Sequence, residues 1–326
     1  MIYIETGSTD VCWNFGLEYY FAVEKPLPDT VFLFWRTTPT LMVGRYQNVL
    51  EEVDRAYAAA HGIRIVRRMS GGGTIYTDLG GWQFTFIEES RGEDIQFQRY
   101  LTPVIKALGE LGVEAAFNGR NDLLVAGRKI SGSAQYRLGT RVVHHGSLLF
   151  DTDLEQMAAA TTVDPYKIQS KSIRSVRERV TNIARHLPVS MDIEAFKDSM
   201  VGCILGTEGA RYALTEVDCG RIAALGRERF SSWESVYSQG PGFNIQRTGR
   251  FPGGSMTFCL EVKKGVIRRA AVTGDFFSAL AGEELGAALE GCCYERTAVE
   301  EALTRRGLGR AVYRVSAAEM ARAIAE

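Results

Sequence analysis

The segment 67–80, RRMSGGGTIYTDLG, constrains the fold more than any other part of this chain. Its three consecutive glycines, Gly71, Gly72 and Gly73, stand between two β-rich runs, 63–68 and 82–87. Glycine loses the most conformational entropy on ordering, so a triplet indicates backbone that closely approaches another group. The N–H groups of such a loop bind anions, and Arg68 on the incoming strand adds a bidentate donor. The alternative is a flexible hairpin turn, because a glycine-rich loop alone is a weak signal.

Two further motifs follow this loop. Residues 118–134, NGRNDLLVAGRKISGSA, predict a turn, a short apolar strand, a tight reversal and a returning strand that carries Lys129. Residues 141–150, RVVHHGSLLF, predict another strand with two adjacent histidines before Gly146. Neighbouring side chains of a strand face opposite sides, so His144 and His145 are not expected to bind one metal ion together.

With these motifs in this order, the sequence resembles the lipoate–protein ligase A family. That family carries an arginine-rich Ser-Gly-Gly-Gly loop, a Gly-Arg-Asn-Asp segment, a Lys-Ile-Ser-Gly segment and a His-His-Gly segment. Residues 175–182, SVRERVTN, and 251–254, FPGG, extend the resemblance from about Trp13 to about Tyr294. The glycine triplet is unspecific, but the ordered set is specific.

Strands and helices that do not alternate regularly predict an α+β fold. The resemblance implies a large mixed-sheet catalytic domain of the biotin/lipoate ligase type over residues 1–240 and a small α+β accessory domain over 248–326. The glycines and proline at 239–244 independently indicate a boundary. The strands expected first are 31–36, 40–44, 63–68, 82–88, 122–125, 128–133 and 141–150, and the helices are 54–60 and 100–111. A hairpin, 255–262 with 266–273, and helices at 280–290, 297–305 and from 317 onward are expected afterwards.

The resemblance implies a two-step ligase. ATP activates the carboxylate of lipoate as lipoyl-AMP, and a lysine of the acceptor then displaces AMP. Since both steps build negative charge, positioning and fixed positive potential are expected to dominate. Lys129 is the expected catalytic residue, against the commoner fate of a surface lysine on a hairpin. The expected ATP and lipoyl-adenylate contacts are Arg68, Ser70, Gly71, Gly72, Gly73, Thr74, Ile75, Tyr76, Asp78, Asn121, Gly132, Ala134 and His145.

The roles of the Asn121–Asp122 pair and of His145 keep an alternative. Asp122 is a candidate Mg²⁺ ligand, since Mg²⁺ prefers carboxylate oxygen and water, but Asn121 and Asp122 also suit a turn. His145 is either a wall of the adenylate pocket or a packed strand histidine. Two positions depart from the family pattern: Thr77 stands where histidine is usual, and Gly81 where asparagine is usual. Both are expected at the rim of the nucleotide loop.

Composition excludes several classes of protein. A net charge of −1 and a pI near 6.5 do not suit a generally basic nucleic-acid binder. The sequence shows neither a signal peptide nor an apolar run of the roughly 18 residues that a membrane span needs. The six cysteines show no C-x-x-C spacing, which indicates reduced thiols rather than a metal cluster. A cytoplasmic enzyme is expected.

The resemblance implies that the partners are lipoyl domains of 2-oxoacid dehydrogenase E2 subunits, the glycine-cleavage H protein, or both. A basic run with Lys167, Lys171, Arg174, Arg177 and Arg179 is either a docking surface for an acidic partner or a solvated helix face.

Three other functions compete with the ligase. An acyltransferase of this fold moves octanoyl or lipoyl groups through a cysteine thioester, but residues 13–202 contain no cysteine. A biotin ligase shares the chemistry, but its Gly-Arg-Gly-Arg loop is missing here. A catalytically altered paralogue that only binds lipoyl domains would explain Thr77 and Gly81, although it would not need Lys129 and Arg68.

Overall fold

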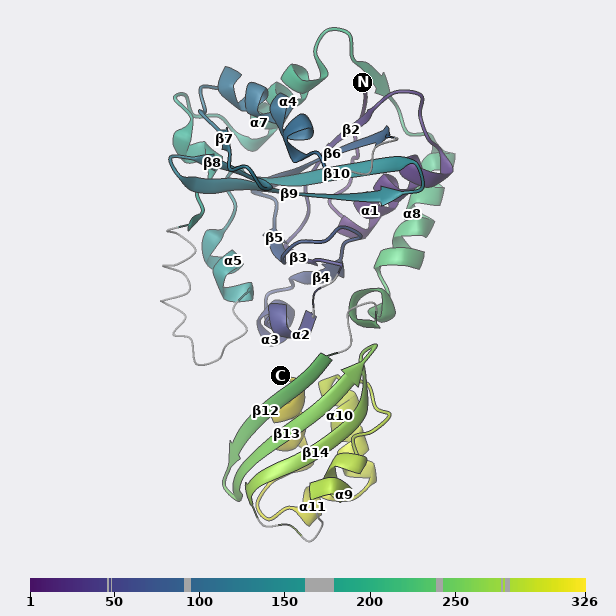
Figure 1. Ribbon diagram of the computed structural model, residues 1–326, viewed down its shortest axis with the longest axis vertical. Coiled ribbons are helices and arrows are strands. Elements are labelled where there is room, and N and C mark those ends of the chain that lie inside the picture. Colours follow the sequence, from purple (N-terminus) through teal and green to yellow (C-terminus); the bar gives the residue numbers. More distant parts are fainter. Residues whose placement is uncertain are drawn as a thin grey trace. The chain divides into compact units, whose positions relative to one another are not determined.

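The computed structural model describes residues 1–45, 47, 49–90, 95–161, 179–238, 243–276, 278 and 282–326. Internal contacts divide the chain into two compact units, Met1–Val236 and Tyr237–Glu326 (Figure 1). The segment 239–242, where the sequence indicates a boundary, lies outside the described residues. Within the described part of the chain, no helix is long and apolar enough to cross a membrane.

The first unit is built on an eight-stranded mixed sheet, which confirms the predicted fold class. Its strands lie in the order β11 (Ala210–Tyr212), β1 (Ile2–Ile4), β2 (Val31–Trp35), β6 (Gly81–Glu89), β10 (Arg141–Leu149), β9 (Arg128–Leu138), β8 (Asp122–Val125) and β7 (Ala116–Phe117). Strand β1 is parallel to both of its neighbours. The strands that follow in the sheet, from β2 across β6, β10, β9 and β8 to β7, pair antiparallel. The predicted strands at 31–36, 82–88, 122–125, 128–133 and 141–150 are confirmed, with β9 five residues longer than expected (138 against 133).

A second sheet in this unit holds the glycine loop. Its order is β4 (Arg64–Arg67), β3 (Thr40–Val43) and β5 (Ile75–Thr77), with β3 parallel to β4 and antiparallel to β5. The glycine loop therefore joins the two edge strands across β3. The sequence predicted β3 and β4, but it did not predict β5.

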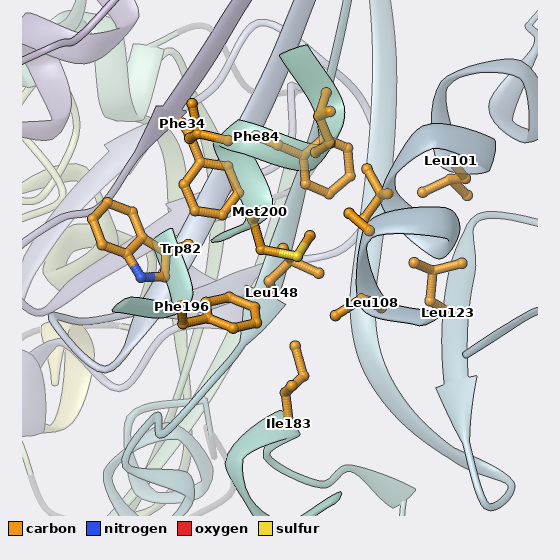
Figure 2. Packing of buried hydrophobic residues seen from close by; sticks show 14 of the residues in the cluster. Phe34, Trp82, Phe84, Leu101, Leu108, Leu123, Leu148, Ile183, Phe196 and Met200 are labelled. Atoms are coloured by element: carbon orange, nitrogen blue, oxygen red, sulfur yellow. The ribbon is translucent and has the colours of Figure 1, made fainter. Parts of the chain in front are cut away.

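Helices cover both faces of the large sheet, which explains the continuous apolar run of β2. Phe32 and Phe34 face α4 (Phe97–Glu110) and α7 (Ile193–Leu205) in one buried cluster. Figure 2 shows Phe34, Trp82 and Phe84 of the sheet packed with Phe196 and Met200 of α7. Val31, Leu33 and Trp35 face the opposite cluster, with α1 (Val11–Tyr19) and α8 (Glu216–Phe230). Side chains of both faces are thus removed from water.

The remaining helices of the first unit are short. The π-helix Tyr20–Glu24 continues α1, and the others are α2 (Val49–Glu52), α3 (Arg55–Ala60), α5 (Leu154–Ala160) and a 3-10 turn (Ile183–His186). A further π-helix, Glu234–Ser238, spans the point in the sequence where the two units divide. The predicted helix at 54–60 is α3, and Asp54 is its N-cap: the Asp54 side chain accepts a hydrogen bond from the backbone N–H of Tyr57. The predicted helix at 100–111 is α4, which begins three residues earlier, at Phe97.

The second unit has a three-stranded antiparallel sheet of β12 (Phe243–Phe251), β13 (Gly254–Lys263) and β14 (Val266–Phe276). Met256, Phe258, Leu260 and Val262 alternate along β13 and are buried. The helices are α9 (Gly282–Ala287), α10 (Arg296–Arg305), α11 (Leu308–Ala311) and α12 (Ala317–Ala325). The predicted hairpin and the last two predicted helices are confirmed, whereas α9 is shorter than the expected 280–290.

Candidate active site

A cavity of about 130 Å³ lies in the first unit. Helix α1, both sheets and the glycine loop contribute its lining: Phe15, Trp35, Met42, Arg68, Gly72, Gly73, Thr74, Ile75, Gln83, Asn121, Lys129, Gly132, Ser133, Ala134, His145, Gly146 and Ser147. The three separate motifs of the sequence therefore meet at one site. Of the predicted contacts, ten line the cavity: Arg68, Gly72, Gly73, Thr74, Ile75, Asn121, Lys129, Gly132, Ala134 and His145.

Lys129 lies on β9, and its Nζ is 2.8 Å from Oδ1 of Asp122 on the neighbouring strand β8. Gly132, three residues along β9, leaves the room that this ammonium occupies. A Cβ atom at Gly132 would lie 2.8 Å from Nζ of Lys129 and 3.0 Å from Cε. The glycine of the Lys-Ile-Ser-Gly motif is thus a condition for the position of the lysine.

The carboxylate of Asp122, the candidate Mg²⁺ ligand, pairs with Lys129 in this structure. The described residues contain no group of three or more histidine, cysteine, aspartate or glutamate side chains placed to hold a metal ion. The Asn121 side chain donates to the Ser133 carbonyl at 3.0 Å, which joins β8 to β9 beside Lys129.

Arg68 lines the cavity, and its guanidinium is hydrogen-bonded to groups of the protein itself. Its Nη1 donates to the Met42 carbonyl, its Nη2 donates to the carbonyls of Gly71 and Gly73, and its Nε donates to Oγ of Ser70. The side chain is 5% exposed, and no carboxylate among the described residues forms an ion pair with it. Burial lowers the pKa of Arg68 to about 10, so it stays charged at neutral pH. Arg68 thus shapes the loop and leaves an uncompensated positive charge behind it.

The glycine loop lies against β3 at very short range. A Cβ atom at Gly44 would lie 2.0 Å from the Gly72 carbonyl oxygen, so only glycine fits at position 44. Gly72 has a φ of +90°, a conformation that side chains other than glycine rarely adopt. With the carbonyls of Gly71 and Gly73 turned toward Arg68, the N–H groups of residues 71–73 have no acceptor among the described residues. They are available for an anion.

His145 and His144 face opposite sides of β10, as predicted. His145 lines the cavity, its Nε2 lies 2.6 Å from Oγ of Ser70, and its Nδ1 lies 3.2 Å from Oε1 of Glu18. His144 is fully buried among Phe84, Phe97 and Tyr100 on the other side, and neither of its ring nitrogens has a partner among the described residues. Desolvation there lowers the pKa of His144 to about 3.

Four predicted contacts do not line the cavity. Ser70 is buried behind it, and Gly71 contributes the carbonyl that Arg68 binds. The hydroxyl of Tyr76 donates to Gln156 of α5. Asp78 accepts hydrogen bonds from the backbone N–H groups of Gly80 and Asp153, so it fixes a turn.

The two departures from the family pattern are not at the cavity rim either. Thr77 is 2% exposed, and its Oγ1 lies 2.7 Å from Oγ1 of Thr37. Gly81 begins β6, where a Cβ atom would lie 2.9 Å from Oγ1 of Thr152. Both residues therefore belong to the packing behind the loop.

The sequence interpretation missed the apolar part of the cavity. Phe15 comes from α1, Trp35 from the end of β2 and Met42 from β3, and their rings and thioether form one wall. Gln83, Ser133, Gly146 and Ser147 were also missed. Two of their polar atoms, Oε1 of Gln83 and Oγ of Ser133, are buried without a partner among the described residues. Such atoms in a cavity wall indicate bonds to a ligand.

No described cysteine suits a thioester mechanism at this cavity. Cys12 is buried, its Sγ donates to the Phe230 carbonyl, and burial raises its pKa to about 11. A thiol in this state is a poor nucleophile. Residues 162–178, which include Lys167, Lys171, Arg174 and Arg177 of the basic run, lie outside the described residues. The chain is described again from Arg179 onward, beside Lys129. The backbone N–H of Thr181 donates to the Lys129 carbonyl at 3.0 Å.

Comparison with known proteins agrees with these features. Residues 10–204 match the family described as the lipoyl protein ligase A/B catalytic domain, and residues 240–324 match the bacterial lipoate protein ligase C-terminus. The chain is 38% identical to lipoate–protein ligase 1 of Staphylococcus aureus over 302 residues, 92% of each protein. It is 38% identical to lipoate-protein ligase LplJ of Bacillus subtilis over 309 residues, 93% of each.

Solved structures show the same fold. A bi-partite lipoate protein ligase from Thermoplasma acidophilum, studied with its E2 lipoyl domain, is 25% identical with a TM-score of 0.65, over 72% of this chain and 95% of that one. A lipoate-protein ligase A bound with ATP is 25% identical with a TM-score of 0.57, over 70% of this chain and 92% of that one. The chain therefore belongs to the lipoate–protein ligase family of enzymes.

Proposed function

We propose that this cavity uses ATP to activate lipoate as lipoyl-AMP and then transfers the lipoyl group to a lysine of an acceptor lipoyl domain. The observation that carries this proposal is the position of Lys129, whose ammonium borders a cavity with a glycine loop on one side and an apolar wall on another. An acyl-adenylate needs these three environments together: an anion-binding backbone, a fixed cation and an apolar pocket.

The parts of the ligand are assigned by their chemistry. The hydrocarbon part of lipoate packs against Phe15, Trp35 and Met42. The α-phosphate accepts hydrogen bonds from the loop N–H groups, and the buried charge of Arg68 favours its negative charge. Oγ of Ser133 and the Gln83 amide give the polar contacts that orient the ligand.

In the first step, a carboxylate oxygen of lipoate attacks the α-phosphorus of ATP. The bond from this phosphorus to the bridging oxygen breaks, and pyrophosphate leaves. Lys129 stabilises the added charge on the α-phosphoryl oxygens. Mg²⁺ when bound would neutralise charge on the leaving pyrophosphate.

In the second step, the neutral ε-amine of the acceptor lysine attacks the acyl carbon. Charge develops on the carbonyl oxygen, which lies between the phosphate and Lys129. The acyl carbon–oxygen bond then breaks, AMP leaves, and the amine nitrogen gives its extra proton to water. One cation thus serves both transition states.

The proposal divides the work between the two parts of the chain. Residues 1–240 hold the adenylate, and residues 248–326 form an accessory domain that assists activation. We propose E2 lipoyl domains and the glycine-cleavage H protein as acceptors, in the cytoplasm, where the six free thiols stay reduced. The basic run at 164–179 is the proposed docking segment for these acceptors.

Lipoate-dependent exchange of labelled pyrophosphate into ATP tests the first step, and mass spectrometry of a supplied E2 lipoyl domain or H protein tests the second. We expect exchange without acceptor and a lipoyl adduct on one acceptor lysine. An octanoyl or lipoyl transferase would label the acceptor only from an acylated carrier protein, without ATP. A paralogue that only binds would give neither signal, and either result would refute the ligase.

A further inference from the structure

A buried hydrogen-bonded chain runs behind the cavity from the glycine loop to helix α1. Nε of Arg68 donates to Oγ of Ser70 at 3.1 Å, and Oγ of Ser70 lies 2.6 Å from Nε2 of His145. Nδ1 of His145 lies 3.2 Å and 3.3 Å from the two carboxylate oxygens of Glu18. Thr85 then donates to Oε1 of Glu18 at 2.7 Å. This hydrogen-bonded network joins Arg68, beside the glycine loop, to Glu18 of helix α1, 50 residues earlier in the sequence, through side chains alone.

The two ends of this network fix the direction of the hydrogen bonds that they make. An arginine only donates and a carboxylate only accepts. Nε of Arg68 therefore donates to Ser70, and Nδ1 of His145 donates to the Glu18 carboxylate. The same logic continues past Glu18, because Thr85 donates to the carboxylate and accepts from Nε1 of Trp35 at 3.0 Å.

These groups are shielded from water, which strengthens each bond. Glu18 is 1% exposed, Ser70 and Thr85 are 0% exposed, and Arg68 is 5% exposed. Tyr136 adds a second donor to Glu18 at 3.2 Å. Hydrogen bonds in such an environment are stronger than in water and support one another, while an interrupted chain leaves unpaired buried groups.

Both ends of the chain also shape the cavity. At one end, Arg68 holds the carbonyls of Gly71 and Gly73, and so sets the orientation of the loop N–H groups. At the other end, Glu18 fixes the orientation of the His145 ring, and Thr85 fixes the orientation of the Trp35 ring. Both rings line the cavity near Phe15. A disturbance at Glu18 therefore reaches the loop, and a disturbance at Ser70 reaches the apolar wall.

We propose that Glu18 and Ser70 are positioning residues that couple the two halves of the cavity, so that each one affects the binding of both lipoate and ATP. Neither residue lines the cavity, although Ser70 was among the nucleotide contacts expected from the sequence. The coupling rests on the proposed function, because that function assigns ATP to the glycine loop and lipoate to the apolar wall.

The test uses the full-length protein and measures the dissociation constants of ATP alone and of lipoate alone by calorimetry. The variants are Glu18→Gln, Ser70→Ala and the double variant. Glutamine keeps an acceptor for Thr85 and His145 but loses the charge, whereas Ser70→Ala removes the central link. We expect each single variant to raise the dissociation constants of both ATP and lipoate by about 2- to 10-fold. This is the range that the loss of one net hydrogen bond gives. In the double variant, the dissociation constant of ATP should rise by less than the product of the two single-variant factors.

Two matched controls separate coupling from general damage. Ser131→Ala also deletes a fully buried hydroxyl on β9, one without a partner among the described residues. Glu88→Gln also neutralises a buried carboxyl that accepts from a tyrosine, Tyr100, but away from the cavity. Both controls should bind ATP and lipoate as the parent protein does. Thermal unfolding identifies loss of folded protein, which lowers the number of binding sites rather than the affinity.

Several results would overturn the coupling. One such result is that Glu18→Gln weakens the binding of lipoate alone, and another is that Ser70→Ala weakens the binding of ATP alone. A third is that the two single effects multiply fully in the double variant. Each outcome means that the two residues act on separate sites. If the parent protein binds neither ATP nor lipoate, the proposed function fails instead, so the two failures are distinguishable.

Discussion

Nζ of Lys129 lies 2.8 Å from Oδ1 of Asp122, across neighbouring strands at the edge of the cavity. The pair is partly exposed, with 34% of the lysine side chain and 22% of the aspartate side chain accessible. The pair lies on two hydrogen-bonded strands, so the Lys129 side chain is already held in place. Little further conformational entropy is lost when a ligand binds. Asp122 thus prepares the cation that the proposed reaction needs.

Lys129→Ala should lower both half-reactions by about 100-fold or more, because one electrostatic contact is removed from two transition states. Pyrophosphate exchange measures the first half-reaction, and acceptor lipoylation from pre-made lipoyl-AMP measures the second. Lys106→Ala, which removes an exposed lysine of α4 outside the cavity, is the control and should be silent. Near-normal adenylate formation in Lys129→Ala would remove this residue from the mechanism.

Asp122→Asn should reduce exchange less than Lys129→Ala does, by about 10-fold or less, because the amide oxygen keeps a contact with the ammonium. The Mg²⁺ concentration for half-maximal exchange should stay unchanged, since the carboxylate pairs with Lys129. A clear rise in the Mg²⁺ requirement of this variant would restore Asp122 as a metal ligand.

Gly132→Ala should impair exchange by displacing Lys129, since the added Cβ atom would lie 2.8 Å from Nζ. Gly220→Ala is a matched change in helix α8, where the new Cβ atom meets nothing within 4 Å. The control should keep activity and gain up to about 1 kcal/mol of stability from helix propensity. Equal activities of the two variants would show that the space beside Lys129 is not needed.

His144→Phe should remove part of the acid sensitivity of the fold. Burial lowers the pKa of His144 to about 3, against about 6.5 in an unfolded chain. Between these values the unfolded chain binds a proton that the folded protein does not. The contribution of His144 is therefore fully present above about pH 6.5 and is lost as pH falls toward 3.

Urea unfolding of both proteins between pH 7 and pH 4 measures this effect. The stability difference in favour of His144→Phe should grow as pH falls, with a slope of up to about 1.4 kcal/mol per pH unit. His61→Gln, at an exposed histidine, is the control and should follow the parent curve. Parallel curves for His144→Phe and the parent would contradict the buried neutral state.

A chain that ends at Ser238 should lose more adenylate formation than transfer from pre-made lipoyl-AMP. The cavity and Lys129 lie in the first unit, and Val236, whose carbonyl accepts from Nε of Arg67, is retained. Activation needs ATP clamped in line with the carboxylate, and an accessory domain can exclude water there. Circular dichroism first checks that the shortened chain is folded. Normal activation without transfer would reverse the roles proposed for the two domains.

Much of the fold could be predicted because its signals are local. Strands β2, β6, β8 and β10 are apolar runs or alternations between turns, and their bounds were predicted to within one residue. Strand β5 could not be predicted, since three residues beside a glycine loop gain their pairing only from β3. Helix α9 ends at Ala287, before the predicted end at 290, and it lies close to β14. A Cβ atom at Gly286 of α9 would lie 2.0 Å from the Ala270 carbonyl.

The candidate site divides in the same way. Lys129, Gly72, Gly73, Gly132 and His145 were predicted because the motifs carry them, and the structure brings them to one cavity. Phe15 and Glu18 were missed because no element was predicted over residues 11–19, where the structure has α1. A glutamate inside this apolar run was the available signal, since a buried carboxylate needs partners from elsewhere in the fold. The use of Arg68 could not be read from the sequence either, because its carbonyl partners depend on how the loop folds back over β3.

The back-to-back histidines of β10 have a consequence for how this protein can evolve. A slip of one residue in the pairing of β10 would turn the unpartnered imidazole into the cavity and carry the partner of Glu18 into the aromatic cluster. Substitutions in the turn at residues 139–140 leave the pairing of β9 with β10 unchanged. A single-residue insertion within β9 or β10 would instead exchange the side chains that face the cavity with those on the opposite face of the sheet. The lengths of these two strands should therefore vary less among related ligases than the identities of most of their residues.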